Sequence, residues 1–334
     1  MGKMTTREIA RMAGVSPAAV SFALNGKKGI SEETRRQILA IAREANYQPA
    51  GAGSHAEKQM NFVVIFRNYL PALDKLFYTE LNSSVMQVCD APNINLIMTS
   101  VQIENGEVTL PDALYADNLD GIIVYGDLDR RIDQELNKLS VPAVVLDSSR
   151  RGLKNAVYVD YANAAYVATR YLINLGHTVI AYLGNDRMHD FNLQTFGGFQ
   201  RATTESGLQL STDRIQLNVY DETSLTKCID NVFRGAAKPT ALFCAADCYA
   251  IHAIRHIHSL GMRVPEDVSI VGIDDIVISA YTIPSLTTIR VDRDRIGELG
   301  LMLLKKQIAG EPCESVTLPL DELIIRESAA APRG

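Results

Sequence analysis

Residues 4–25 read MTTREIARMAGVSPAAVSFALN, and this stretch predicts two short helices joined by a tight turn. Thr5 and Glu8 have the spacing of a capping box, in which each side chain accepts from the backbone N–H of the other. Gly14 ends the helical spacing of apolar residues that follows. A Ser-Pro pair then offers an N-cap and a first-turn proline whose missing N–H costs nothing. The pattern predicts a helix-turn-helix, and an ordinary helical hairpin would satisfy it equally well.

A third helix is expected to run from Ser31 to about Ala45. Ser31 is a good N-cap, and the two acidic residues after it lie in the first turn, where the helix dipole favours negative charge. The apolar positions that would face the first two helices are Ile38, Leu39, Ile41 and Ala42. The segment therefore predicts a three-helix N-terminal head.

Charge is unevenly distributed along the chain. Residues 1–60 hold nine Lys or Arg against five Asp or Glu, a net charge of +4. Since the whole chain has a net charge of −6, the remaining residues carry −10. A basic head on an acidic body suits a head that meets phosphate. A solvated charged surface would give the same count.

The composition is that of a globular protein with several domains. The chain has 334 residues, of which 47% are hydrophobic and 22% are charged, enough for two or three separate cores. It shows neither a membrane-spanning apolar run nor a signal peptide. Its cysteines are odd in number and scattered, which indicates reduced thiols and a cytoplasmic protein: Cys89, Cys228, Cys244, Cys248 and Cys313.

From residue 61 onward, short apolar runs alternate with amphipathic segments. This alternation predicts two doubly wound α/β subdomains with largely parallel sheets. The predicted strands lie in residues 61–66, 93–101, 121–126, 142–147, 179–184, 213–219, 240–247 and 268–275, and the first, second, third and fourth of them are expected to be buried. The predicted helices are 76–88, 132–139, 162–175, 195–206, 225–233 and 248–260.

Several stretches resemble the lactose-repressor/galactose-repressor (LacI/GalR) family of bacterial transcription regulators. They are AGVSPAAVSFALNG (13–26), ISEETRRQILAIAREANYQP (30–49), LINLGHTVIAYLG (172–184), PSLTTIRVDRDRIGELG (284–300) and PLDELIIRES (319–328). The resemblance implies a cytoplasmic homodimeric repressor that binds a near-palindromic operator in double-stranded DNA. It also implies a body of the periplasmic-binding-protein-like type, with a small sugar or sugar-like effector in a cleft between its subdomains.

The same resemblance implies a division of the chain. The helix-turn-helix domain would span residues 1–49, a linker 50–60 and the effector-binding body 61–330. The first subdomain would hold about 61–159 and 291–320, and the second about 160–290 and 321–330, with three crossings between them. In the family the linker carries a leucine that wedges into the minor groove. Here that position is Ala56, and Gly51 and Gly53 oppose a helix.

The resemblance also assigns DNA-binding positions in the head. The second helix would enter the major groove, and three of its four outward side chains are unable to donate a hydrogen bond to a base. The four are Pro17, Ala18, Ser21 and Phe22. Phosphate or backbone contacts are expected at Thr6, Ser16, Asn25, Lys27, Thr34 and Tyr47. Sequence discrimination would then depend on Ser21, on apolar contacts and on DNA shape.

The effector site is expected at strand ends facing the cleft. The resemblance assigns it Phe77, Tyr78, Tyr125, Asp147, Gln194, Thr195, Tyr220 and Asp274. Thr195 stands where many sugar-binding members have an arginine, and Arg187, Asn192 or Gln194 would substitute for it. The effector is a small sugar, a nucleoside-like molecule or absent. The alternative for each carboxylate is a fold-supporting role, above all for Asp247 and Asp275.

Other functions have less support. Cys248, His252 and His256 share one face of a predicted helix, as metal ligands would, but that helix is a scaffold element whose face must also supply core, so no metal is expected. The chain contains no nucleophile elbow, Walker loop or dinucleotide fingerprint, so neither an enzyme nor a cofactor is expected. The second hypothesis for function is a solute-binding sensor with weak or non-specific DNA binding.

Overall fold

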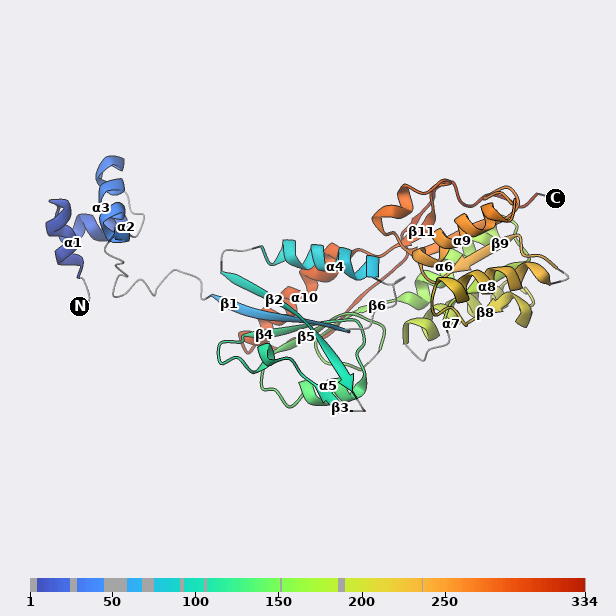
Figure 1. Cartoon of the computed structure of the whole chain (residues 1–334), viewed down its shortest axis with the longest axis horizontal. Coiled ribbons are helices and arrows are strands. Elements are labelled where there is room, and N and C mark those ends of the chain that lie inside the picture. Colours follow the sequence, from blue (N-terminus) through green and yellow to red (C-terminus); the bar gives the residue numbers. More distant parts are fainter. Residues whose placement is uncertain are drawn as a thin grey trace. The chain divides into compact units, whose positions relative to one another are not determined.

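The computed structural model describes most of the chain as two compact units, Met1–Gln59 and Met60–Gly334 (Figure 1). These units, the head and the body, are considered separately. The residues described are 5–24, 29–44, 59–67, 75–90, 93–104, 107–150, 152–185, 190–235 and 237–333. Among them no helix is both long and apolar enough to cross a membrane.

The described part of the head contains the helices α1 (Thr6–Ala13), α2 (Pro17–Leu24) and α3 (Glu32–Glu44). The predicted capping box is confirmed: the Thr5 backbone N–H donates to Glu8 Oε2 at 2.6 Å, and the Glu8 N–H donates to Thr5 Oγ1 at 3.4 Å. Gly14 ends α1 with a φ of 66°, a left-handed conformation that glycine adopts without strain.

The three helices of the head enclose a small apolar core. Its buried members come from every helix and match the helical spacing of the sequence: Ile9, Ala10, Ala13, Val20, Ala23, Ile38 and Ala42. Val15, in the turn, is only partly buried and packs against this core from outside. The head is therefore held together by contacts that its own described residues supply.

The first sheet of the body has the strand order β12-β6-β5-β4-β1-β2-β3 and is parallel except for the β2–β3 pair. The strands are β1 (Met60–Arg67), β2 (Ile94–Glu104), β3 (Glu107–Thr109), β4 (Gly121–Tyr125), β5 (Ala143–Ser148), β6 (Ala156–Val159) and β12 (Val316–Leu318). Helices α4 (Lys75–Val88) and α10 (Arg293–Ile308) cover one face, and α5 (Arg130–Leu136) covers the other with the short η1 (Asp112–Tyr115) (Figure 1).

Alternation along β1 explains why both faces of this sheet are covered. Phe62 and Val64 belong to the core beneath α4 and α10, whereas Val63 and Ile65 belong to the core beneath α5. Successive side chains of a strand point to opposite faces, so a continuous apolar run supplies two cores at once.

The second sheet has the order β13-β11-β10-β9-β7-β8, and only its β11–β13 pair is antiparallel. The strands are β7 (Ile180–Leu183), β8 (Ile215–Gln216), β9 (Ala241–Cys244), β10 (Ser269–Asp274), β11 (Thr287–Arg290) and β13 (Leu323–Ile324). The helices around it are α6 (Tyr161–Asn174), α7 (Asp190–Glu205), α8 (Glu222–Arg234) and α9 (Asp247–Ser259), with the short η2 (Thr212–Arg214) and η3 (Val277–Ala280). Gly198 lets α7 approach α6, because a Cβ there would overlap the Ala162 carbonyl oxygen.

The chain passes between the sheets three times. It leaves the first sheet after β6, returns from β11 to α10 and β12, and leaves again to form β13. Segments from both ends of the body therefore meet at the junction of the two sheets, where the effector-site residues were expected.

Three sequence predictions need correction. Residues 93–101 form a strand that is only partly buried: Val101 is 2% exposed, but Ile97 and Met98 of β2 are 48% and 40% exposed. Only the short β3 lies outside β2 in the sheet. The strand predicted over 213–219 shrinks to the two residues of β8, at a sheet edge. Helix α7 begins at Asp190 instead of at Thr195.

Candidate functional sites

The exposed side of α2 is small and mostly apolar. Pro17, Ala18 and Ser21 are exposed, as the sequence predicted for a helix that reads DNA. Phe22 is partly buried, because its ring lies against Gly29: a Cβ on that glycine would lie 3.1 Å from the ring carbons. The α2 surface that stays open to a partner is thus smaller than the predicted one.

Two predicted phosphate-contact residues already have partners within the head. Ser16 Oγ accepts from the Ala19 N–H at 3.2 Å, and Thr34 Oγ1 lies 2.7 Å from Ser31 Oγ. Both arrangements cap helices, and Thr6 is the first residue of α1. Asn25, Lys27 and Tyr47, as well as Ala56 and the rest of the linker up to residue 58, lie outside the described residues.

The contact of Arg35 with α2 was missed by the sequence analysis. Arg35 Nη1 donates to the carbonyl oxygens of Phe22 at 3.2 Å and of Ala23 at 3.3 Å. The sequence had counted this residue only as one of the positive charges of the head. No local spacing could show the contact, since the partners are 12 and 13 residues apart and on different helices.

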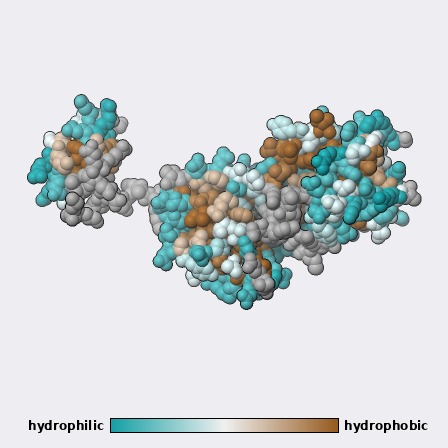
Figure 2. Space-filling view, in the orientation of Figure 1, coloured by the Kyte–Doolittle hydropathy of each residue, from teal (hydrophilic) through white to brown (hydrophobic). Residues whose placement is uncertain are grey.

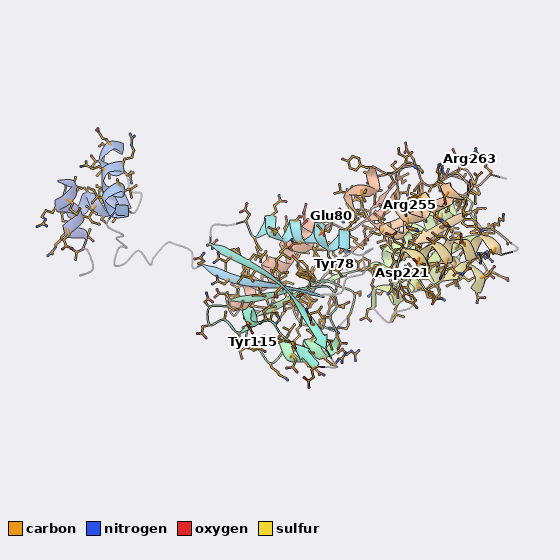
Figure 3. All side chains as sticks on the ribbon, viewed as in Figure 1. Tyr78, Glu80, Tyr115, Asp221, Arg255 and Arg263 are labelled. Carbon is orange, nitrogen blue, oxygen red and sulfur yellow. The ribbon has the colours of Figure 1, made fainter. Side chains whose placement is uncertain are left out.

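In the body, three aromatic residues assigned to the effector site lie together beside the first sheet. Phe77 packs edge-on against Tyr78 at a centroid distance of 5.3 Å, and Tyr78 stacks on Tyr125 at 6.5 Å. Tyr78 lies where α4 approaches the second sheet (Figure 3). Gly126 has a φ of 66°, and a Cβ there would overlap the Tyr78 hydroxyl. Glycine at that position therefore makes room for the Tyr78 side chain.

Asp147, at the end of β5, joins this group to the second half of the body. Its carboxylate accepts from Tyr161 Oη at 2.5 Å, and Tyr161 begins α6. The side chain is only 7% exposed, and this burial raises its pKa to about 7. The hydrogen bond from Tyr161 opposes the rise, the nearby Asp127 adds to it, and Tyr78 and Arg293 oppose it. Burial therefore moves the pKa of Asp147 towards neutral pH.

Asp274, at the end of β10, lies in the same electrostatic environment. It is 6% exposed and has a φ of 128°, an uncommon conformation for a residue with a side chain. The pKa of Tyr161 is raised well above its usual value first by burial and then by the charges of Asp147 and Asp274. The charges of two carboxylates, one from a strand end of each sheet, thus raise the pKa of one buried tyrosine.

Further contacts cross between the two halves near this group. Glu80 of α4 lies 2.9 Å from Arg293 Nη2 and accepts from the Val277 N–H at 2.9 Å. Gln194 Nε2 donates to the Ser149 carbonyl oxygen. Gln194 was predicted from the sequence, whereas Tyr161, Glu80 and Arg293 were missed. The sequence offers only their positions as a clue: Tyr161 and Arg293 lie next to predicted crossings, and Glu80 lies next to the Phe77–Tyr78 pair.

The remaining two predicted effector residues have other surroundings. Thr195 is fully buried, and its hydroxyl lies 3.0 Å from Tyr182 Oη and donates to the Phe191 carbonyl at 3.0 Å. It packs inside the second half, so we remove it from the candidate site. Tyr220 follows β8; its hydroxyl donates to Asn218 at 3.3 Å and its N–H to Ser224 at 2.9 Å. Arg187 lies outside the described residues.

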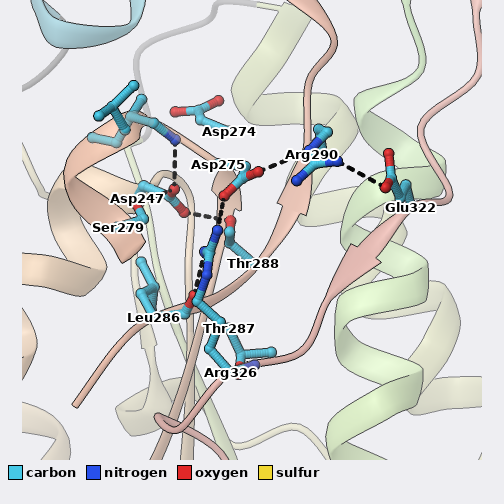
Figure 4. Close-up of polar contacts among 12 residues, drawn as sticks. Asp247, Asp274, Asp275, Ser279, Leu286, Thr287, Thr288, Arg290, Glu322 and Arg326 are labelled. Atoms are coloured by element: carbon cyan, nitrogen blue, oxygen red, sulfur yellow. Dashed lines mark hydrogen bonds and ion pairs between the residues drawn. The ribbon is translucent and has the colours of Figure 1, made fainter. Parts of the chain in front are cut away.

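The fold-supporting roles considered for Asp247 and Asp275 are confirmed (Figure 4). Asp247 is fully buried and accepts from Ser279 Oγ at 2.6 Å and from Thr288 Oγ1 at 2.5 Å. Its burial raises its pKa to about 6, although these hydrogen bonds oppose the rise. Asp275 pairs with Arg290 at 2.9 Å and Arg326 at 2.6 Å. Both carboxylates therefore stabilise the end of β10 and its neighbours, next to Asp274.

The histidine face of α9 is paired with the neighbouring helix. His252 Nε2 lies 2.9 Å from Thr226 Oγ1, and His256 Nε2 lies 2.8 Å from Asp230 Oδ1, both on α8. In the portion of the chain that the structure describes, no three His, Cys, Asp or Glu residues are grouped as metal ligands would be. These histidines hold two helices together.

Two family models match separate parts of the chain. A family model described as "Bacterial regulatory proteins, lacI family" matches residues 5–50, and one described as "Periplasmic binding protein-like domain" matches residues 169–329. Catabolite control protein A of Priestia megaterium is 30% identical over 327 residues, which cover 96% of this chain and 97% of the relative. The transcriptional repressor PurR of Pasteurella multocida is 28% identical, with 97% and 98% covered.

Solved structures agree in fold. The lac repressor dimer bound to operator and the anti-inducer ONPF superposes with a TM-score of 0.72 at 24% identity, covering 99% of this chain and all of the other. A complex of the transcriptional regulator CelR with cellobiose superposes with a TM-score of 0.67 at 23% identity, covering 98% of this chain and 100% of the other. A LacI family regulator from Enterococcus faecium with bound ribose has a TM-score of 0.70 at 23% identity, over 81% of this chain and 99% of the other.

Proposed function

Since the chain belongs to the LacI family of bacterial regulatory proteins, a family of non-enzymatic DNA-binding transcriptional repressors, we propose that it binds a near-palindromic operator as a homodimer. Two heads related by a two-fold axis would occupy two half-sites. Its DNA affinity would be set by a small effector in the body. A regulator that binds an operator would act in the cytoplasm.

The observation that carries the DNA-binding proposal is the head itself. A capped α1, a glycine turn and an α2 that leaves Pro17, Ala18 and Ser21 exposed form a helix-turn-helix with an open second helix. Ser21 alone among these side chains has a hydrogen-bonding group. We infer that apolar contacts and DNA shape supply much of the discrimination. Asn25, Lys27, Thr34, Tyr47, Thr6 and Ser16 remain proposed backbone contacts.

We propose the division of the chain into a DNA-binding domain of residues 1–49, a linker of 50–60 and a body of 61–330. Within the body, the two sheets correspond to two subdomains, of about 61–159 with 291–320 and of about 160–290 with 321–330. The three passages of the chain between the sheets support these limits.

Exposed apolar side chains support the homodimer. Tyr281 and Ile283, which follow η3, are 78% and 94% exposed, and Val277 within η3 is also exposed. Ile97 and Met98 on β2 are also exposed, on opposite faces of the sheet, and Figure 2 shows hydrophobic surface on both halves of the body. Contiguous exposed apolar surface of this kind commonly marks an interface. A second copy of the chain is the partner that the near-palindromic site requires.

We propose that the effector binds at the junction of the two sheets, beside the aromatic residues of the first sheet. The proposed site comprises Phe77, Tyr78, Tyr125, Asp147, Tyr161, Gln194 and Asp274. The carboxylates offer acceptors to hydroxyl groups, and stacked aromatic rings suit the apolar face of a sugar or a base. Arg293 directs Nη1 to the Asp274 carbonyl at 2.7 Å and Nη2 to the Asp275 carbonyl at 2.9 Å. With those donors engaged, the site favours a neutral hydroxyl-rich effector over an anion.

The proposed coupling follows from where the site residues are attached. Asp147 belongs to the first sheet, and Asp274 belongs to the second. An effector that bonds to both would favour one relative arrangement of the subdomains. The size of that preference equals the difference between the free energies of binding to the two arrangements. The favoured arrangement would change the spacing of the two heads in a dimer.

The test is DNA selection with the purified full chain. Enrichment of a near-palindromic duplex from random DNA, with a stated salt concentration, is the expected result. Enrichment of no sequence, together with steep salt-dependent binding to all duplexes, would reject the proposal and favour the solute-binding sensor. Melting-temperature shifts with a panel of neutral sugars, nucleosides and sugar phosphates would identify the effector class.

A further inference from the structure

The described residues of helix α2 carry no positive charge at its C-terminal end. Its sequence is PAAVSFAL, with no basic residue in the last turn. The last four carbonyls of any helix lack intrahelical partners, and the helix dipole leaves partial negative charge there. A cation placed at this end would stabilise the helix, and within the described part of the head one comes from α3.

Arg35 supplies that cation. Its Nη1 donates to the Phe22 and Ala23 carbonyls at 3.2 and 3.3 Å, two of the last four carbonyls of α2. Its own helix is anchored, since Ile38 of α3 is fully buried in the head core and the Ser31 Oγ accepts from the Thr34 N–H at 3.1 Å. The guanidinium thus connects the end of α2 to a fixed support.

We propose that Arg35 is a positioning residue for the DNA-reading helix, and that its charge is used inside the head instead of on a phosphate. The inference rests on the proposed DNA binding. Pro17 and Ala18 recognise bases by close apolar contact, which weakens steeply with small displacements. A helix that recognises bases by apolar contact must therefore be positioned more accurately than a helix whose long polar side chains can adjust to the DNA.

Binding measurements separate positioning from phosphate contact. The variants are Arg35→Gln and Arg35→Lys in the full chain, with Arg36→Gln, an exposed neighbour on α3, as the matched control. The probes are a duplex selected from random DNA by the unmodified chain and a duplex of scrambled sequence, titrated over a range of salt. Arg35→Gln is expected to weaken binding to the selected duplex by about tenfold, the size of a helix-end charge effect. Binding to the scrambled duplex and the salt slope should stay nearly unchanged.

Arg35→Lys tests geometry at constant charge. A lysine ammonium is a point charge without the planar fork of a guanidinium, so this variant should also lose discrimination between the two duplexes. The proposal is overturned if Arg35→Gln weakens both duplexes equally and lowers the salt slope by about 0.9, the signature of one lost phosphate contact. It is also overturned if Arg35→Lys behaves like the unmodified chain on both duplexes.

Amide hydrogen exchange without DNA tests the cap even if DNA binding fails. In Arg35→Gln the amides of Ser21, Ala23 and Leu24 are expected to exchange faster, while those of Ile9 and Ile38 keep their protection. Faster exchange in all three helices, or no change in α2, would contradict the proposal. If the unmodified chain selects no duplex, the proposed function fails, and the exchange data still decide the role of Arg35.

Discussion

The hydroxyl of Tyr161 donates a hydrogen bond to the carboxylate of Asp147 at 2.5 Å, and this bond joins the first helix of one half of the body to the end of a strand of the other. Burial raises the pKa of Asp147 to about 7, far above the value of a free aspartate. Protonation of Asp147 is therefore expected to affect the contact between the two halves of the body.

Replacing Asp147 should change how stability depends on pH. Between about pH 4 and 7 the folded chain keeps a proton on Asp147 that the unfolded chain has released, so the free energy of unfolding falls as pH rises through this window. In Asp147→Asn this contribution is absent, and the variant should lose less stability than the unmodified chain over the same range. Denaturant unfolding at several pH values measures it. Asp247 adds the same trend to both proteins, and parallel profiles would contradict the assignment.

Tyr161→Phe removes the hydroxyl that bonds to Asp147. The loss of one buried hydrogen bond should lower the free energy of unfolding by about 1 kcal/mol. It should also raise the pKa of Asp147 further, because a hydrogen bond to the ionised carboxylate favours ionisation. Tyr166→Phe is the control, since that residue lies on the same helix and its hydroxyl bonds to Glu205 at the surface. A pH profile of unfolding identical to that of the control would show that Tyr161 has no effect on Asp147.

Asp247→Asn should be strongly destabilising and should leave effector-site chemistry untouched. The amide has one acceptor oxygen where the carboxylate has two, and its NH₂ would face hydroxyl and N–H donors that Asp247 now satisfies. We expect a loss of about 2–4 kcal/mol in denaturant unfolding. Asp117→Asn, at an exposed position, is the matched control and should change little. Equal stability of the two variants would argue against a structural role for Asp247.

Asp274→Asn should abolish the response to the effector and preserve the fold. A neutral sugar that raises the melting temperature of the unmodified chain is expected to lose that effect in the variant, because a hydroxyl donor bonds more strongly to a carboxylate than to an amide oxygen. Asp294→Asn, exposed on α10, is the control. An unchanged sugar-induced shift would exclude Asp274 from the site.

Ile283→Asp should weaken self-association. The side chain is 94% exposed, so the substitution costs the folded monomer little, whereas a charge buried in an interface is strongly unfavourable. Sedimentation at several protein concentrations should show a larger monomer fraction. Tyr115→Asp, at another exposed aromatic site on η1, serves as comparison. A dimer of unchanged strength would exclude this surface.

Much of the fold could be predicted because it depends on local spacing. The capping box of α1, the glycine after it and the apolar runs of β1, β4, β7 and β10 follow from neighbours a few residues apart. Two of the three errors lie at or next to a sheet edge, and the third is the start of α7. The apolar run 93–101 is consistent with a buried strand, but its position next to a short edge strand left Ile97 exposed. A periodicity records which face is apolar and carries no information on what covers that face.

The candidate site was predicted only in part, for a related reason. Resemblance to a family placed Tyr78, Asp147 and Asp274 near the junction, and the structure brings them together. Thr195 had been placed there by alignment with an arginine position, but its hydroxyl is used by Tyr182 in the core. Tyr161 and Arg293 went unnoticed because their partners lie across a crossing of the chain.

By itself, the sequence determined the three capped helices of the head, the alternation of strands and helices in the body and the family to which both belong. The helices and strands depend on hydrogen bonds and side-chain periods within a few residues, and the family is indicated by short motifs such as residues 13–26 and 284–300. Only the tertiary structure decided that Arg35 caps α2, that Tyr161 meets Asp147 and that Asp247 supports the strand ends. These contacts join residues between 12 and 41 positions apart, and such partners are chosen by how helices and strands pack together.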